Sequence, residues 1–375
     1  MGAESYLSLN NESITQRKLL RYWSLKGEIM EINRPASRGV RRAMRRLFTT
    51  AVVAVLSAVP VLVGALPTAS AATLPTWHFK VTVRMAQSTA DLNGGLVFAL
   101  SKTLTQMDTV NHRFNDPGVL KGKTSFEITT FDTYTDGASD ELAKPHPAGG
   151  FLLIYDENAN MGGGWFGDRQ AIVHKWPTLQ GGSFAPDATD GLVHEFGHSR
   201  EATDEYACDV DTNPVNGAGY HESPSIMSYP YGVRNWSAYS VGLINADAGT
   251  VNTSSALASR YFPPVMRIRA LSSTGSNVSH ATVTLYPVKW FSLSVTSTPA
   301  LSGYTDSSGY YKFSSNPFGP GAATPRNPWD LAYCNFLVKV TSGKRTAYQW
   351  MSLPAVGSAY FKNPTGTYTL NVKLP

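Results

Sequence analysis

Cysteine is scarce in this 375-residue chain, which contains only Cys208 and Cys334. Two thiols exclude a disulfide-dense miniprotein and any metal site built from four thiolates. Charged residues are also few, at 16% of the chain. Hydrophobic residues reach 42% and aromatic residues 11%, which excludes a wholly disordered chain because this is ample material for packed cores. The length predicts two domains, or one large domain with additional segments.

The net charge of +5 is unevenly distributed along the sequence. Ten of the 32 basic residues and four of the 27 acidic residues lie in residues 1–71. Residues 72–375 therefore carry 22 basic and 23 acidic residues, a net charge of −1. Because the part beyond residue 71 has no basic excess, we expect no nucleic-acid partner.

The N-terminal region has the order of a secretory signal. A cluster of four arginines within 41–46 precedes an uncharged run at 47–66, and small residues follow, with Ala69 and Ala71 at the −3 and −1 positions. This pattern predicts that residues 1–71 are an N-terminal extension and signal peptide, cleaved near Ala71, and that the protein is secreted. No stable membrane insertion is then expected after cleavage.

Two questions about export stay open at this point. The uncharged run is about long enough to cross a bilayer, so a membrane-anchored protein is the alternative, although Pro60 and Gly64 favour cleavage. An oxidising environment would also permit a bond between Cys208 and Cys334, but the sequence does not show whether they are close enough to pair.

Hydrophobic periodicity divides the remaining chain into two regions. Residues 72–262 mix both periods and predict an α+β domain, with strands at 78–85, 126–131, 149–156 and 169–176, and helices at 90–114, 187–200 (capped by Asp187 or Thr189) and 236–247. Residues 263–375 predict an all-β sandwich, with strands at 265–271, 281–288, 290–297, 309–315, 335–342, 346–353 and 367–374.

The segment with the clearest chemistry is DGLVHEFGHSREATDEY, residues 190–206. Four positions on a helix differ by about 40°, so His194 and His198 project from one face, one turn apart, where a single Zn²⁺ can take both imidazole nitrogens. Glu195 lies about 100° around the same helix, which suits a general base that accepts a proton from the attacking water. A catalytic zinc needs a third protein ligand, and Asp204 supplies a suitable carboxylate.

These residues together resemble the metzincin group of zinc peptidases. The spacing of His194, His198 and Asp204 is similar to the HExxHxxGxxD pattern of snapalysin-type enzymes. The HEFGH…DEY motif also resembles that of bacterial peptidases related to the IgA-degrading metallopeptidases. Residues 225–229, SIMSY, resemble the Met-turn of metzincins. The resemblance implies a mixed sheet with an active-site helix, Met227 beneath a catalytic zinc, Tyr229 near the developing oxyanion, and a protein or peptide substrate hydrolysed by a secreted zinc endopeptidase.

The sequence departs from that family at one position. Glu201 stands where the family has a glycine that lets the chain turn after the second histidine, and a left-handed backbone costs a non-glycine residue about 1–2 kcal/mol. Three other third ligands therefore stay open, Glu205, His221 and Glu222, and Glu222 would make the site resemble a gluzincin. The departure also leaves open a catalytically silent binding or adhesion protein with the metallopeptidase fold.

Three further features give secondary expectations. Asp209, Asp211 and Asn213 offer oxygen ligands of the type that Ca²⁺ takes, without the terminal Glu of the calcium-loop motif. The strand that contains His174 is a candidate edge strand for pairing with an extended substrate. Residues 263–375 resemble the carboxypeptidase-regulatory-like modules of secreted hydrolases, which implies a stabilising module or one that binds cell wall, glycan or substrate.

Overall fold

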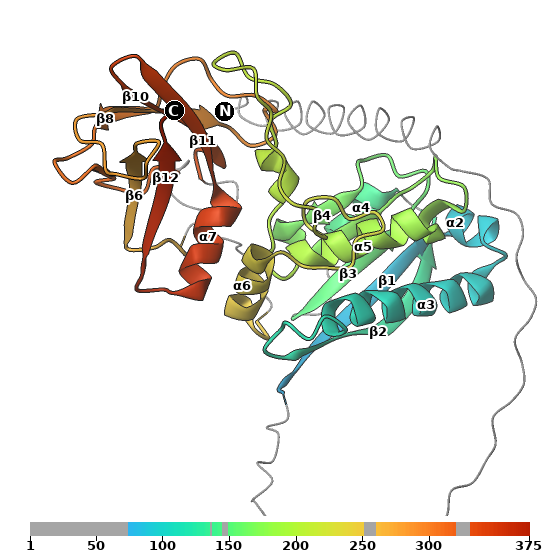
Figure 1. Cartoon of the computed structure of the whole chain (residues 1–375). Helices are drawn as coiled ribbons and strands as arrows, with labels where there is room; N and C mark the ends of the chain where they lie inside the picture. The colour runs from blue at the N-terminus through green and yellow to red at the C-terminus, as the bar shows by residue number, and fades with distance from the viewer. Residues whose placement is uncertain (1–73, 136, 145–148, 251–259, 320–330) are drawn as a thin grey trace, which may run out of the picture. The chain divides into compact units, whose positions relative to one another are not determined.

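A computed structural model describes residues 74–135, 137–144, 149–250, 260–319 and 331–375 (Figure 1). The predicted signal peptide, residues 1–71, lies outside these ranges and stays a prediction. Residues Leu74–Pro375 form one compact unit. The secondary structure is mixed, with three sheets and several helices, which agrees with the expected α+β class. The predicted domain boundary near residue 263 stays a prediction.

The first sheet contains five strands in the order β2-β1-β3-β5-β4. Four of them are parallel, and β4 is antiparallel to β5. The bounds are β1 Thr76–Ala86, β2 Lys123–Tyr134, β3 Gly150–Tyr155, β4 Gly164–Phe166 and β5 Ala171–His174. The four strands expected from periodicity are therefore present. The expectation that the strand of His174 forms the sheet edge is wrong, because the short β4 covers it.

The expected helix at 90–114 is two helices, α2 (Gln87–Leu92) and α3 (Leu96–Asn115). The break falls at Gly94 and Gly95, which both have φ near +89°. Glycine has no Cβ and adopts this backbone readily, whereas a continued helix cannot contain it. Periodicity alone spans the break because apolar residues continue on both sides of it. A short helix, α4 (Ala138–Ala143), follows β2.

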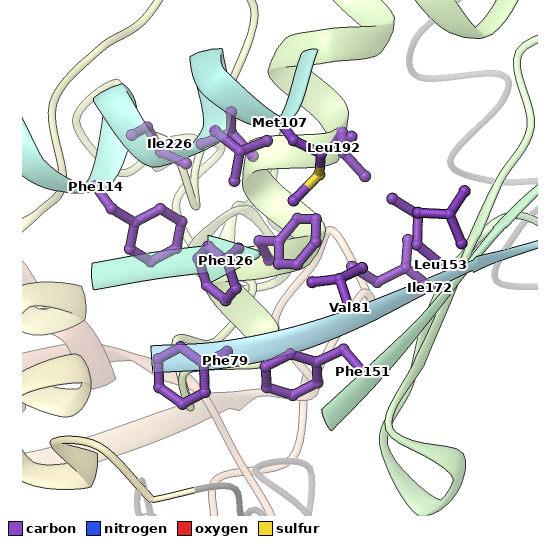
Figure 2. Close-up of a cluster of buried hydrophobic side chains, with 14 of the residues drawn as sticks. Phe79, Val81, Met107, Phe114, Phe126, Phe151, Leu153, Ile172, Leu192 and Ile226 are labelled. Atoms are coloured by element: carbon purple, nitrogen blue, oxygen red, sulfur yellow. The ribbon is translucent and has the colours of Figure 1, made fainter. Parts of the chain in front are cut away.

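Both faces of the sheet are covered. On one face, β1 contributes Phe79 and Val81 to a core that includes Met107 and Phe114 of α3 and Leu192 of α5 (Pro186–His198) (Figure 2). On the other face, alternate residues of β3 and β5 pack with Ala138 of α4. All six residues of β3 are buried, as expected for a central parallel strand.

The helix that contains His194 and His198 is α5, Pro186–His198. Ala185 is its N-cap and makes no side-chain capping bond, so the expected caps, Asp187 and Thr189, are wrong. Pro186 explains this start, because proline has no N–H to satisfy and its fixed φ suits the first helical position. A Cβ at Gly191 would lie 2.5 Å from the ring of Trp176, so this glycine lets the helix pack closely. The predicted helix at 236–247 is α6, Ala238–Asp247, which Ser237 caps by accepting from Ser240 N–H.

The C-terminal region contains a four-stranded sheet in the order β11-β10-β7-β8 and a three-stranded sheet in the order β12-β6-β9. The bounds are β6 Val265–Leu271, β7 Thr282–Val288, β8 Leu301–Tyr304, β9 Tyr310–Lys312, β10 Asn335–Ser342, β11 Arg345–Ser352 and β12 Thr367–Lys373. Residues from both sheets, including Ile268, Val338 and Val372, share one core, as in a sandwich.

Two sequence expectations fail in this region. Residues 290–297 form only isolated bridges and no strand, and α7 (Leu353–Lys362) makes the region not wholly β. Ser352 caps α7 by accepting from Ala355 N–H, and Pro354 occupies the first turn of the helix. Both residues are signals of a helix start, but the strand-like pattern of the preceding residues obscures them. Among the described residues, no helix is both long and apolar enough to span a bilayer.

Candidate metal centre

The C-terminal end of α5 and the segment after it bring three potential metal ligands together. His194 Nε2 lies 2.9 Å from Asp204 Oδ1, and His198 Nε2 lies 3.1 Å from the same oxygen. One ligand atom from each residue can be chosen so that all three lie within 4.8 Å of one another. In the described part of the chain this is the one such group of His, Cys, Asp and Glu side chains. The two nitrogens and one carboxylate oxygen match a donor set that zinc accepts.

Backbone carbonyls fix the orientation of both imidazoles. His194 Nδ1 lies 2.8 Å from Ile226 O, and His198 Nδ1 lies 2.8 Å from Ala202 O. A carbonyl only accepts, so each Nδ1 donates, and in the neutral form of each ring, which a metal ligand requires, the lone pair lies on Nε2. This arrangement is typical of metal-ligating histidines, whose other ring nitrogen donates to an outer partner. The site residues therefore fit a divalent cation.

The electrostatics of the group are those of a buried anion between two imidazoles. Burial opposes ionisation of Asp204, but the adjacent His198 and His194 hold the pKa of this carboxyl well below its usual range. Burial likewise opposes charge on His198, yet the charge and hydrogen bond of Asp204 raise its pKa to about 9. Asp204 is thus an anionic carboxylate, the protonation state that a metal ligand requires.

The turn after the second histidine forms with a non-glycine residue in the left-handed region. Glu201 has φ of 68°. Two backbone bonds typical of a Schellman turn close the helix, from Ala202 N–H to Gly197 O at 3.1 Å and from Glu201 N–H to His198 O at 3.0 Å. The backbone that the family achieves with glycine is therefore present here, at the cost of about 1–2 kcal/mol for a residue with a Cβ.

Residues 225–229 form the tight turn that the SIMSY motif predicts. Tyr229 N–H donates to Ser225 O at 2.8 Å, and Ser228 N–H donates to the Ser225 carbonyl and hydroxyl, each at 3.1 Å. Met227 is fully buried against α5, where a Cβ on Gly197 would lie 2.6 Å from its Sδ. Gly197 therefore leaves room for the side chains of Met227 and Trp236.

Glu195 lies beside the edge strand. A Cβ built on Gly164 of β4 would lie 4.0 Å from Glu195 Oε2. Tyr229, the expected oxyanion contact, packs edge-on against Tyr231 with ring centroids 5.6 Å apart. Burial, followed by the charges of Asp187 and Glu195, raises the pKa of Tyr231. Tyr231 is thus a neighbour of the general-base candidate that sequence reasoning missed.

The alternative third ligands have other partners. Glu205 accepts hydrogen bonds from three serine hydroxyls: Ser225, Ser237 and Ser240. Burial raises the pKa of Glu205 to about 7, and the serine bonds oppose this rise. His221 lies 3.0 Å from Asp209, and Glu222 Oε1 accepts from the Tyr220 hydroxyl at 2.7 Å. None of the three joins the group formed by the two histidines and Asp204.

The loop considered for calcium is organised by internal hydrogen bonds. Asp209 accepts from His221 and from Glu222 N–H, whereas Asn213 accepts from the backbone N–H groups of residues 215 and 216. Asp209 and Asp211 do not join a third acidic or histidine side chain in a metal-sized group within the described ranges. The calcium expectation therefore gains no support.

Two aromatic residues near the ligands were not anticipated. Tyr206 donates a hydrogen bond to Asp204, and its ring centroid lies 5.9 Å from that of His194. Phe291, from the C-terminal region, lies with its ring centroid 5.8 Å from that of Tyr206 and donates its N–H to Ala207 O at 2.9 Å. The DEY tripeptide was a sequence signal for Tyr206, but no local pattern indicates Phe291, which is 85 residues further on.

Comparisons with known proteins add no family assignment. No protein-family model and no curated protein matches the chain. Solved structures with a likeness include a chaperone–substrate complex (TM-score 0.33, 10% identity, 48% of this chain and 36% of that one). Catechol 1,2-dioxygenases from an Acinetobacter species, inhibited by bound mercury, and from Pseudomonas arvilla have TM-scores of 0.16, identities of 11% and 10%, and cover 29% of this chain. The chain spans about a third to a half of the matched proteins, at 36% to 52% of their lengths, and TM-scores this low carry no functional information.

Proposed function

We propose that this protein is a secreted zinc-dependent endopeptidase of the metzincin type. The observation that carries the proposal is the convergence of His194, His198 and Asp204 at the end of α5, with both imidazoles oriented by backbone carbonyls. A site that only stabilised a fold would not need Glu195, a carboxylate on the same helix beside the ligands.

The chain's residues have separate roles in this proposal. His194, His198 and Asp204 would hold zinc, which when bound supplies a Lewis acid at the scissile carbonyl and makes water more acidic. Glu195 accepts the proton of the attacking water and delivers it to the leaving amine. Tyr229 or its neighbour Tyr231 donates a hydrogen bond to the oxyanion that develops on the carbonyl oxygen.

The edge strand supports a peptide substrate. β4 occupies the end of the sheet order, so its outer side has no strand partner among the described strands. An extended peptide commonly adds itself to such an edge, where backbone hydrogen bonds hold it without regard to sequence. Because Gly164 of β4 lies beside Glu195, a peptide bound along this edge would pass the general base.

Glu195→Gln tests the mechanism with minimal change in shape. We expect zinc content to stay at the wild-type value and cleavage of casein or a quenched-fluorescent peptide to fall about 10²- to 10⁴-fold, because a general base is lost. Glu127→Gln, at an exposed position on β2, is the matched control and should cleave as the wild type does. Undiminished cleavage by Glu195→Gln would exclude this mechanism.

His198→Ala tests the metal site independently of activity. We expect elemental analysis to find zinc in the wild type and to find it lost from this variant, because two ligands cannot retain the ion against a chelator. A gelatin zymogram with and without chelator then connects zinc to cleavage. Zinc retained by His198→Ala would remove this histidine from the ligand set.

The competing functions receive less support. A silent binding protein was favoured by Glu201, but the left-handed turn forms with that residue in place. A gluzincin site would need Glu222, which instead binds Tyr220. Secretion and cleavage near Ala71 concern residues outside the described ranges, and N-terminal sequencing of protein from the culture medium tests both. Binding of cell wall or glycan by residues 263–375 stays a prediction.

A further inference from the structure

We propose that Cys208 and Cys334 are joined by a disulfide bond in the exported protein, and that this bond staples the segment after Asp204 to the C-terminal sandwich. Cys208 ends the 3-10 helix η3, Glu205–Cys208, and Cys334 immediately precedes β10. The proposal does not depend on zinc or on peptide cleavage.

The two side chains belong to one buried apolar cluster. Both are thiols in the structure and are fully buried, with exposed fractions of 1% and 0%. Cys334 lies close enough to Cys208 to contribute to the raised pKa of the Cys208 thiol. The other fully buried members of the cluster are aliphatic: Val210, Val288, Val295 and Leu337.

Backbone interactions hold the two segments beside each other independently of the sulfurs. Asn335 Nδ2 donates to Cys208 O at 3.2 Å, and Cys334 Sγ lies 3.4 Å from Ala207 O. Cys334 N–H donates to Val288 O at 3.0 Å, which fixes its position beside β7. The segments that carry the two cysteines are therefore adjacent in the fold.

This contact is informative because the chain has only two cysteines. A buried residue touches about 6–12 others, so two given residues of a chain this long would be neighbours by chance in only about one case in thirty to sixty. Burial alone has no need of sulfur, since the surrounding positions are filled by valine and leucine. A paired cysteine is what an oxidising compartment selects at such a contact.

The bond forms by exchange with an external disulfide, either a small molecule or a protein. The thiolate of one cysteine attacks a sulfur of that disulfide, which gives a mixed disulfide and releases one thiolate. The second cysteine then attacks the first cysteine's sulfur and releases the other thiolate. The cysteines are oxidised, the external disulfide is reduced by two electrons, and the two thiol protons end on the released thiols.

Because both thiols are buried in the folded chain, the disulfide should form during folding. Burial, followed by the effect of the neighbouring Cys334, raises the pKa of the Cys208 thiol well above its usual range. The reactive thiolate is thus suppressed in the folded chain. We expect oxidation while the segments are still accessible, and slow reduction once they are packed.

Thiol labelling tests the bond directly. Protein collected from the culture medium is unfolded in guanidinium with a maleimide and without reductant, and its mass is measured. We expect an unlabelled monomer lighter by two hydrogen atoms than the reduced chain, and two labels after reduction. Labelled thiols before reduction, or a disulfide-linked dimer, would overturn the proposal.

Thermal unfolding tests the stapling role. The oxidised wild type should melt about 5 °C or more above the same chain reduced while unfolded and refolded with reductant, because the bond closes a long loop. The double variant Cys208→Ala, Cys334→Ala should melt at one temperature whether or not reductant is present. Equal melting temperatures for oxidised and reduced wild type would refute the staple.

Discussion

Gly197→Ala should weaken zinc binding without altering a proposed ligand, because it displaces the side chain of Met227 beside the candidate metal centre. The added Cβ would lie 2.6 Å from Met227 Sδ and 3.0 Å from Cζ3 of Trp236. Since carbon atoms in contact are normally about 3.5–4.0 Å apart, the methionine sulfur must move by about 1 Å. Met227 belongs to the same turn as Ile226, whose carbonyl orients His194.

The magnitude follows from two opposed effects. Overpacking a filled core costs about 1–3 kcal/mol, whereas replacing glycine by alanine in a helix returns up to about 1 kcal/mol. We expect the free energy of unfolding of Gly197→Ala to fall by about 1–2 kcal/mol. Because the displaced turn orients a ligand, zinc affinity should fall by about 10- to 100-fold, the usual effect of losing an outer-shell contact.

Two measurements on a mutant cycle check this reasoning. Urea unfolding is measured with chelator present, so that bound metal does not add to stability, and zinc affinity is measured by competition with a fluorescent chelator. In the background of Met227→Ala the closest clash is absent, so adding Gly197→Ala should cost much less than it does in the wild type. An equal cost in both backgrounds would refute the packing explanation.

Three further predictions follow from groups around the site and the core. Burial lowers the pKa of His174 from 6.5 to about 4, so the unfolded chain binds the proton more readily than the folded chain does. Up to about 3 kcal/mol of the free energy of unfolding, present above pH 6.5, should therefore be lost as the pH falls to 4. Urea unfolding of His174→Gln should lack this loss. Tyr206→Phe removes the hydroxyl that bonds to the third ligand and should weaken zinc binding about 10-fold, whereas Tyr220→Phe, a control remote from the ligands, should not. Tyr229→Phe should lower kcat about 10²-fold with little change in KM. If only Tyr231→Phe has this effect, Tyr231 makes the oxyanion contact instead of Tyr229.

Local periodicity predicted those features of the site that one helix determines. His194 and His198 are one turn apart, and this spacing brings their rings together with centroids 4.7 Å apart. Asp204 lies beyond the end of that helix, so its approach depends on the turn at Glu201. That part could be predicted only from the resemblance to a family, because helix geometry ends before it.

The features that the sequence did not predict also lack a local pattern. β4 is three residues long and begins in a run of glycines, so it has too few alternating side chains to produce a strand pattern. The ring contact of Phe291 with Tyr206, and the cluster that Cys208 shares with Cys334, connect positions far apart in sequence. Contacts of this kind arise from tertiary packing, which single-sequence periodicity does not contain.

The structure changes the interpretation of the C-terminal region from an appended module to a support of the candidate metal centre. Asp204 precedes a short 3-10 segment, which has few internal hydrogen bonds and needs outside anchors to hold a ligand in place. Glu205 provides one anchor, through three serine hydroxyls and through its N–H to Met227 O at 2.9 Å. The other anchors come from the sandwich, through Phe291 N–H to Ala207 O and Asn335 to Cys208 O. Because the segment of the proposed ligand Asp204 is held from both sides, loss of the sandwich should impair zinc binding even though none of the three proposed ligands belongs to it.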